Sequence, residues 1–206
     1  MNYDFIEIGT CDFDTLIQST SDQIGLTIEP LQIYLDQLPN NPNVIKVNSA
    51  VSISDGRCNI FWVHPDDISK YNLPWYIRGC NSINSPHPTT LKILQENNLE
   101  HLTKIENVEV LSWTSLVKRY NIQDVKYLKI DCEGHDFIIV NHILDNNCGV
   151  LPKKIEFEAN DLTTEESRIQ TLQKALQYGY NFNYFSEAGQ VLLTLNSLEN
   201  IFNVNI

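Results

Sequence analysis

The chain has 206 residues, 42% of them hydrophobic and 19% charged, a composition typical of one globular domain with a sizeable core. Its formal net charge of −12 opposes binding to the phosphate backbone of a nucleic acid. No apolar stretch approaches the roughly 20 residues that span a bilayer, and the N-terminus lacks a signal-peptide pattern. We therefore expect a single domain over residues 1–206 with no nucleic-acid and no membrane partner.

The five cysteines are irregularly spaced and form no CxxC pair, which argues against a disulfide framework or a zinc site. An odd number of cysteines, several of them in apolar runs, is typical of free thiols in a reducing compartment. The expected location is therefore the cytoplasm.

The first part of the chain alternates apolar runs with segments of helical spacing. One predicted helix carries Phe13, Leu16 and Ile17, and a second begins at Pro30, which suits a first helical position. The predicted strands are 4–8, 25–29, 44–52 and 60–63, the last returning antiparallel after the Asp55-Gly56 turn.

Residues 64–90 are predicted to be an irregular, ordered insertion, because they hold four of the eight prolines and several aromatic side chains. Beyond them the predicted helices are 88–99, 114–120, 135–144 and one that ends at Gly179, and the strands are 108–111, 125–131, 154–158, 180–185 and 190–195. This order predicts an α/β fold of the Rossmann-like type: a doubly wound, mostly parallel seven-stranded sheet with a C-terminal antiparallel hairpin around the turn 186–189.

A tight turn follows the first predicted strand at Gly9-Thr10, where a Cβ would block the approach of a ligand. Glu29 follows Glu7 by 22 residues, the spacing at which a carboxylate accepts hydrogen bonds from a ribose diol. The turn has one glycine and two aspartates, Asp12 and Asp14, which would repel a pyrophosphate but suit an ammonium group such as that of S-adenosylmethionine. An ordinary strand-turn-helix with solvated acids explains the turn equally well.

A second group of ionisable side chains, Asp131, Glu133, His135 and Asp136, follows the buried strand 125–131. It is expected at the carboxyl edge of the sheet, where ligands bind in open α/β folds. Crowded carboxylates raise one another's pKa, which is one way to produce a general base. A helix N-terminus decorated with acids is the alternative, and it accounts for Asp131 less well than for Glu133 and Asp136.

The insertion supplies the candidate substrate-binding residues, which are Trp75, Arg78, Asn81, Ser82 and His87. Aromatic and amide groups can form a carbohydrate platform, and an arginine can hold a carboxylate or phosphate; a surface loop pinned by prolines is the alternative. Glu158 and Asn160 are expected near the carboxyl edge as further substrate-binding residues. Asp131 and Glu158 are the candidate ligands for a divalent metal, but no metal cofactor is expected, because hydrogen bonds to loop backbone explain these residues more simply.

Four segments together resemble the FkbM family of methyltransferases: Ile6-Glu7-Ile8-Gly9, Glu29-Pro30, residues 48–52, and residues 128–136 with the sequence Leu-Lys-Ile-Asp-Cys-Glu-Gly-His-Asp. The resemblance implies a class I, S-adenosylmethionine-dependent O-methyltransferase that acts on a hydroxyl of a small molecule, most often a sugar or natural product.

The resemblance also implies roles for single residues of this chain. Those that contact the cofactor are Glu7, Gly9 and Thr10 near its methionine part, Glu29 at the ribose, Pro30 at the start of the next helix, Asn48, Ala50 and Val51 around adenine, and Asp131. Asp12 and Asp14 are added to the cofactor-binding residues because their charge suits the ammonium group. The residues beside the transferred methyl group are Asp131, Glu133 and His135, with Asp131 or His135 as the base. The chain departs from the family where Cys11-Asp12 replaces a second glycine. The chain also begins almost at the first strand. A further expectation is therefore that another domain of a larger enzyme supplies part of the site.

Two other functions remain open. A non-catalytic binding module that retains the fold would explain the single-glycine turn. A nicotinamide oxidoreductase is disfavoured, because the turn lacks the several glycines that a pyrophosphate needs.

Overall fold

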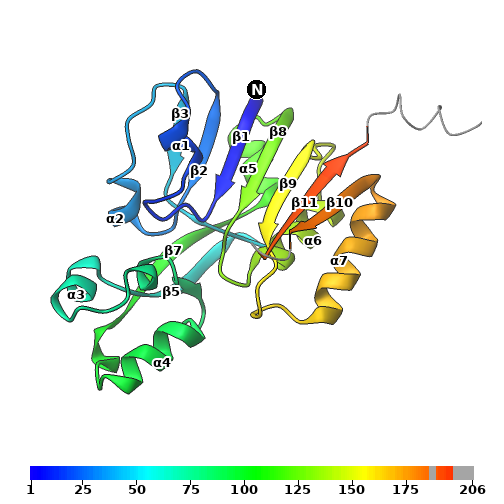
Figure 1. Cartoon of the computed structure of the whole chain (residues 1–206). Helices are drawn as coiled ribbons and strands as arrows, with labels where there is room; N and C mark the ends of the chain where they lie inside the picture. Colours follow the sequence, from blue (N-terminus) through cyan, green and yellow to red (C-terminus); the bar gives the residue numbers. More distant parts are fainter. Residues whose placement is uncertain (186–188, 197–206) are drawn as a thin grey trace, which may run out of the picture.

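The computed structural model describes residues 1–185 and 189–196, and these form two sheets and their covering helices (Figure 1). The main sheet has seven strands in the order β10-β11-β9-β8-β1-β2-β3. Neighbours from β9 to β3 are parallel, whereas β11 is antiparallel to both of its neighbours, so the predicted fold class and C-terminal hairpin are confirmed. Of the predicted hairpin turn, residues 186–188 lie outside the described residues. The strands are β1 (Asn2–Ile8), β2 (Gly25–Ile28), β3 (Val44–Val47), β8 (Asp124–Ile130), β9 (Lys154–Glu158), β10 (Tyr180–Phe185) and β11 (Gln190–Leu195).

Helices cover both faces of the main sheet. On one face, Phe5 of β1 packs with Ile17 and Leu35, which belong to α1 (Leu16–Ser19) and α2 (Gln32–Leu35). On the other face, Ile6 and Ile8 of the same strand pack with the apolar side chains of α5 (Trp113–Arg119), α6 (Asp136–Asp145) and α7 (Glu165–Gln177). Because side chains alternate along β1, this strand contributes to the packing on both faces of the sheet. None of the described helices is both long and apolar enough to cross a membrane.

The single strand predicted over 44–52 is wrong, because the chain changes sheets in the middle of it. Asn48 donates hydrogen bonds to the backbone oxygens of Glu29 and Pro30 (3.2 and 2.8 Å), and the chain turns there. Residues beyond the turn form β4 (Ala50–Ser52), the first strand of a second sheet with the order β4-β7-β5-β6.

The predicted strands 60–63 and 108–111 also belong to this second sheet and not to the main one. They lie within β5 (Gly56–Val63) and β7 (Thr103–Ser112), which pair antiparallel along their full overlap. Their inward side chains, such as Cys58, Ile60 and Val110, form a separate apolar cluster with Leu31 and Tyr34. This local core accounts for a second sheet that strand spacing alone does not reveal.

The insertion is also more regular than predicted. It contains α3 (Pro65–Lys70), the 3₁₀ turn η1 (Trp75–Arg78), β6 (Ser82–Ile83) and the start of α4 (Pro88–Glu96), with the 3₁₀ turn η2 (Glu100–Leu102) after it. In α3 and α4 a proline occupies the first helical position, and the preceding histidine, His64 or His87, caps the helix through its Nδ1 atom. The expectation that Pro30 begins a helix is wrong, since α2 begins at Gln32.

Candidate active site

A cavity of about 290 Å³ lies at the carboxyl ends of β1, β2, β8 and β9, where the second sheet covers them. Figure 1 shows β5, β7, α3 and α4 on the side toward which the arrows of the parallel strands point. Because the strand order reverses between β1 and β8, this is the topological switch point where ligands bind in such folds. The predicted site residues that line the cavity are Gly9, Thr10, Asp14, Glu29, Pro30, Ala50, Val51, Trp75, Asn81, Asp131, Glu133, His135 and Glu158.

The other predicted site residues do not line the cavity: Glu7, Asp12, Asn48, Arg78, Ser82, His87 and Asn160. Most of them support residues that do, while Ser82 donates a hydrogen bond to the backbone oxygen of Ser85. Asn160, for example, donates to the carboxylate of Glu158 (2.7 Å). The structure therefore divides the predicted set into a cavity wall and a supporting layer.

Gly9 is placed where no other residue fits. Its φ angle is +78°, and a Cβ there would lie 1.9 Å from the backbone oxygen of Asp131. Its N–H donates to the oxygen of Ile28 (2.9 Å), and the N–H of Asp131 donates to Ile8 (2.9 Å). The ends of β1, β2 and β8 thus approach one another closely at the floor of the cavity.

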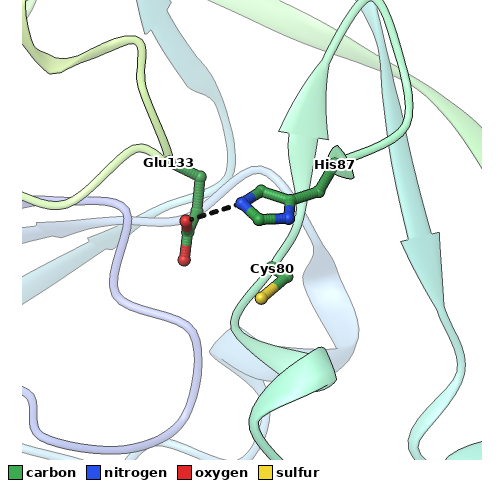
Figure 2. Close-up of side chains that lie close together, drawn as sticks. All are labelled: Cys80, His87 and Glu133. Atoms are coloured by element: carbon green, nitrogen blue, oxygen red, sulfur yellow. Dashed lines mark ion pairs between the residues drawn. The ribbon is translucent and has the colours of Figure 1, made fainter. Parts of the chain in front are cut away.

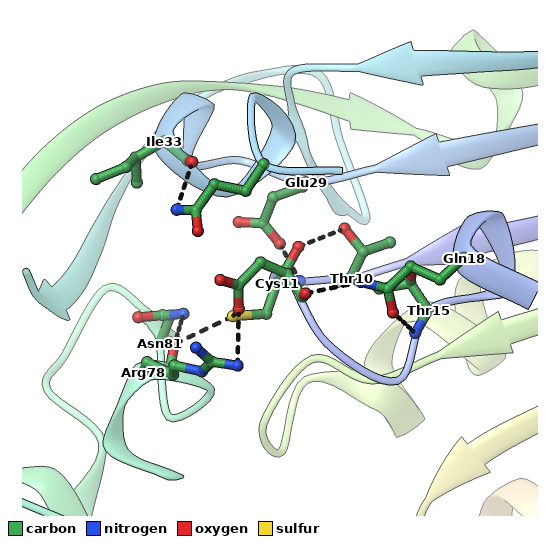
Figure 3. Close-up of polar contacts among 10 residues, drawn as sticks. Thr10, Cys11, Thr15, Gln18, Glu29, Ile33, Arg78 and Asn81 are labelled. Carbon is green, nitrogen blue, oxygen red and sulfur yellow. Dashed lines mark hydrogen bonds and ion pairs between the residues drawn. The ribbon is translucent and has the colours of Figure 1, made fainter. Parts of the chain in front are cut away.

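Glu29 joins the loops that follow β1 and β2. Its two carboxylate oxygens accept one backbone N–H each, from Cys11 and Leu31, both at 2.9 Å. Figure 3 shows the contact with Cys11. The side chain is almost fully buried, and burial raises its pKa to about 7. The N–H of Thr10 also stabilises the charged form. A carboxylate has about four acceptor positions, so it can still bind a hydroxyl group of a ligand.

Glu7 is fully buried behind the cavity wall. Its carboxylate accepts the N–H of Leu16 (2.9 Å) and pairs with Lys129 (3.2 Å), and burial raises its pKa. Lys129 in turn lines the cavity and donates to the backbone oxygen of Asp14 (2.8 Å). Glu7 thereby shapes the β1 turn instead of facing a ligand.

Arg78 joins the insertion to the β1 turn. Its guanidinium lies 3.4 Å from the carboxylate of Asp12 and 4.7 Å from the centre of the Phe13 ring, and its backbone oxygen lies 3.4 Å from the Cys11 sulfur (Figure 3). Phe13 also packs edge-on against Trp75, with 5.7 Å between ring centres. Asp12 and Arg78 therefore neutralise each other, and the exposed Trp75 remains at the cavity.

The loop after β8 presents Asp131, Glu133 and His135 to the cavity, held by Asp136. That fully buried carboxylate accepts the N–H groups of Cys132, Gly134 and Glu158 at 3.2–3.4 Å, and burial raises its pKa to about 8.

Burial and the nearby Glu133 raise the pKa of Asp131 to about 6, although water still reaches its side chain through the open cavity. His135 Nε2 lies 2.9 Å from the Ser52 hydroxyl, and burial lowers its pKa, so its ring is neutral at pH 7. Glu158 faces the same space, with a pKa raised by burial to about 7.

Sequence reasoning missed several residues of the wall, namely Ser49, Tyr76, Cys80 and Lys129. Ser49 is fully buried, and its hydroxyl has no hydrogen-bond partner among the described residues, which suits a polar group of a ligand. Ser49 belongs to the segment 48–52 that carries part of the family resemblance, and the change of sheets at residue 48 brings it to the cavity. The predicted metal candidates Asp131 and Glu158 both line the cavity. The close group of potential metal-ligand atoms in the described part of the chain is Cys80, His87 and Glu133 (Figure 2).

The fold and cavity define a doubly wound α/β protein with a small-molecule site at its switch point. Residues 7–198 match the family model described as the Methyltransferase FkbM domain, so the chain belongs to the FkbM methyltransferase family. No curated protein matched the chain.

Proposed function

We propose that the chain transfers a methyl group from S-adenosylmethionine to a hydroxyl of a small molecule, and that sugars and glycans are the acceptor class. The observation that carries the donor proposal is Glu29, a buried carboxylate at the end of β2 that lines the cavity and can still bind a hydroxyl group. The close turn at Gly9 fits a ligand that combines a diol, a flat base and a charged tail, and so does the Ser49 hydroxyl, which has no partner within residues 1–185 and 189–196.

Bound in this cavity, S-adenosylmethionine would supply an electrophilic methyl group on a sulfonium cation. Glu29 and Ser49 would bind it, and the carboxylates of the wall would favour its positive charge. The Asp131 carboxylate is suited to take the proton of the acceptor hydroxyl, because a pKa of about 6 leaves it mostly ionised at neutral pH. The neutral His135 is the second candidate for that proton.

The acceptor proposal draws on the aromatic wall of the cavity. Trp75 is 64% exposed and packs edge-on against Tyr76, so an indole ring is accessible to solvent beside the carboxylates. Such a ring can stack on the apolar face of a sugar ring. All five cysteines are free, which supports a reducing, cytoplasmic location.

Calorimetric titration with S-adenosylmethionine and S-adenosylhomocysteine tests the donor. Micromolar binding is expected, and Glu29→Ala should weaken it by roughly 1–3 kcal/mol, the cost of lost charged hydrogen bonds. Glu96→Ala, an exposed glutamate on α4, is the control and should bind like the wild type. Because Glu29 also holds two loops, Glu29→Gln and a thermal unfolding curve for each variant separate binding from folding.

A folded protein that binds neither compound would contradict the donor proposal and favour a binding module that retains the fold. If binding is found, radiolabelled methyl transfer to a panel of sugars, phenols and amines tests the acceptor. Product labelled on nitrogen, or only on phenols, would refute the corresponding part of the proposal.

A further inference from the structure

His87 belongs to the insertion but contacts the loop that carries the candidate catalytic residues. It is buried at the start of α4, and its Nε2 lies 3.1 Å from a carboxylate oxygen of Glu133 (Figure 2). Its Nδ1 accepts the N–H of Thr89 at 3.2 Å and so caps the helix. Glu133 lines the cavity, whereas His87 does not.

The cap determines which nitrogen of the neutral ring carries the proton. Nδ1 uses its lone pair to accept the Thr89 N–H, so the proton lies on Nε2. An Nε2–H group is a donor, and the atom that it faces is a carboxylate oxygen. A metal ligand would need the Nε2 lone pair, which this tautomer does not offer. In this tautomer His87 and Glu133 form a hydrogen-bonded pair, and the Nε2 of His87 offers no lone pair to a metal.

Glu133 is held from two directions. Its own backbone is left-handed, with φ +48°, and the N–H groups of its neighbours Cys132 and Gly134 both donate to Asp136. His87 then holds the side chain. Fixing both the strained backbone and the carboxylate of one residue is typical of a group whose position matters for function.

We propose that His87 is a positioning residue of the candidate active site, whose Nε2–H holds the Glu133 carboxylate at the cavity wall. The inserted segment thus completes the site instead of only covering it. The importance of Glu133 for methyl transfer rests on the proposed function, but its contact with His87 can be tested without cofactor or acceptor.

The test is NMR of the imidazole nitrogens and glutamate carboxyl carbons at one fixed pH. The wild type should show His87 protonated on Nε2, with a slowly exchanging N–H signal that Glu133→Gln alters. Asparagine is a good helix cap but too short to reach Glu133. His87→Asn should therefore keep α4 capped and shift the Glu133 carboxyl signal, while the other glutamate carboxyl signals stay at their wild-type positions. His87→Gln, which keeps a donor at similar reach, should restore that signal.

His64→Asn is the matched control, because His64 caps α3 in the same way ahead of a proline. It should leave the Glu133 signal unchanged. The proposal would be overturned if the Glu133 carboxyl signal in His87→Asn is the same as in the wild type. The proposal would also be overturned if His87 is protonated on Nδ1 and its signals move together with those of Cys80 and Glu133 when Zn²⁺ alone is added. That result would establish a metal site. Neither outcome bears on whether S-adenosylmethionine binds.

Discussion

Gly9→Ala tests whether the close approach of β1 and β8 creates the cavity floor. The left-handed backbone at Gly9 alone costs an alanine about 1–2 kcal/mol. In addition, its Cβ would lie 1.9 Å from the Asp131 oxygen and 2.8 Å from the carbonyl carbon, so backbone and not a flexible side chain must move. Moving it disturbs the hydrogen bonds Gly9–Ile28 and Asp131–Ile8, each with a net contribution of about 1 kcal/mol.

Gly149→Ala isolates the backbone contribution, because Gly149 has φ +83° and its Cβ position meets no atom of the described residues within 4 Å. A chain of this size loses about 2–4 °C in unfolding temperature per kcal/mol. We therefore expect Gly149→Ala to lower it by about 2–8 °C and Gly9→Ala by at least about 4 °C more, with loss of S-adenosylhomocysteine binding only in the latter. Equal losses measured by calorimetry would refute the close-approach argument.

Three further changes test buried polar groups, at the cavity and away from it. Burial gives Asp136 a folded-state pKa of about 8, far above its unfolded value, so the folded chain keeps a proton that the unfolded chain loses. The free energy of unfolding, measured by urea titration, should therefore fall as the pH rises from about 4 to 8. In Asp136→Asn this free energy should fall less steeply over the same pH range. Arg78→Ala should destabilise the chain by about 1–2 kcal/mol in thermal unfolding, because it removes the contact with the Phe13 ring and leaves the Asp12 side chain buried without its partner. The control is Arg119→Ala, which removes an exposed ion pair and should cause no measurable change. Tyr180→Phe should cost about 1–3 kcal/mol in the same assay, because the Pro152 oxygen loses its buried 2.6 Å hydrogen bond; a neutral result would show that water replaces it.

Much of the cavity wall could be predicted from the sequence, because parallel strands place their carboxyl ends at one edge of a sheet. Gly9, Glu29 and Asp131 each follow a recognisable strand, and all three line the cavity. Glu7 shows the limit of this reasoning. It lies one residue earlier on β1 than Ile8, and the alternation of side chains directs it toward α1 and Lys129. A carboxylate near a strand end has the same sequence pattern whether it faces a ligand or a helix.

The second sheet could not be predicted, because its cause is tertiary. Residues 44–52 are compatible with one strand throughout, and only the bonds from Asn48 to the backbone of residues 29 and 30 separate β3 from β4. In the insertion, α4 was predicted as the helix 88–99, whereas α3 was not predicted, and the reason is local. The N-cap of α3 is His64, whereas sequence rules expect serine, threonine, aspartate or asparagine there.

The insertion has a larger role than a loop that covers the cavity. Through Arg78 it contacts Asp12 in the loop after β1, and through His87 it contacts Glu133 in the loop after β8. These are the two loops that flank the switch point, so a shift of the insertion displaces both walls of the cavity together. An acceptor that binds against Trp75 would therefore be coupled to the donor side through Phe13 and Arg78. The sequence showed that these residues cluster, but only the structure shows that they connect the two loops.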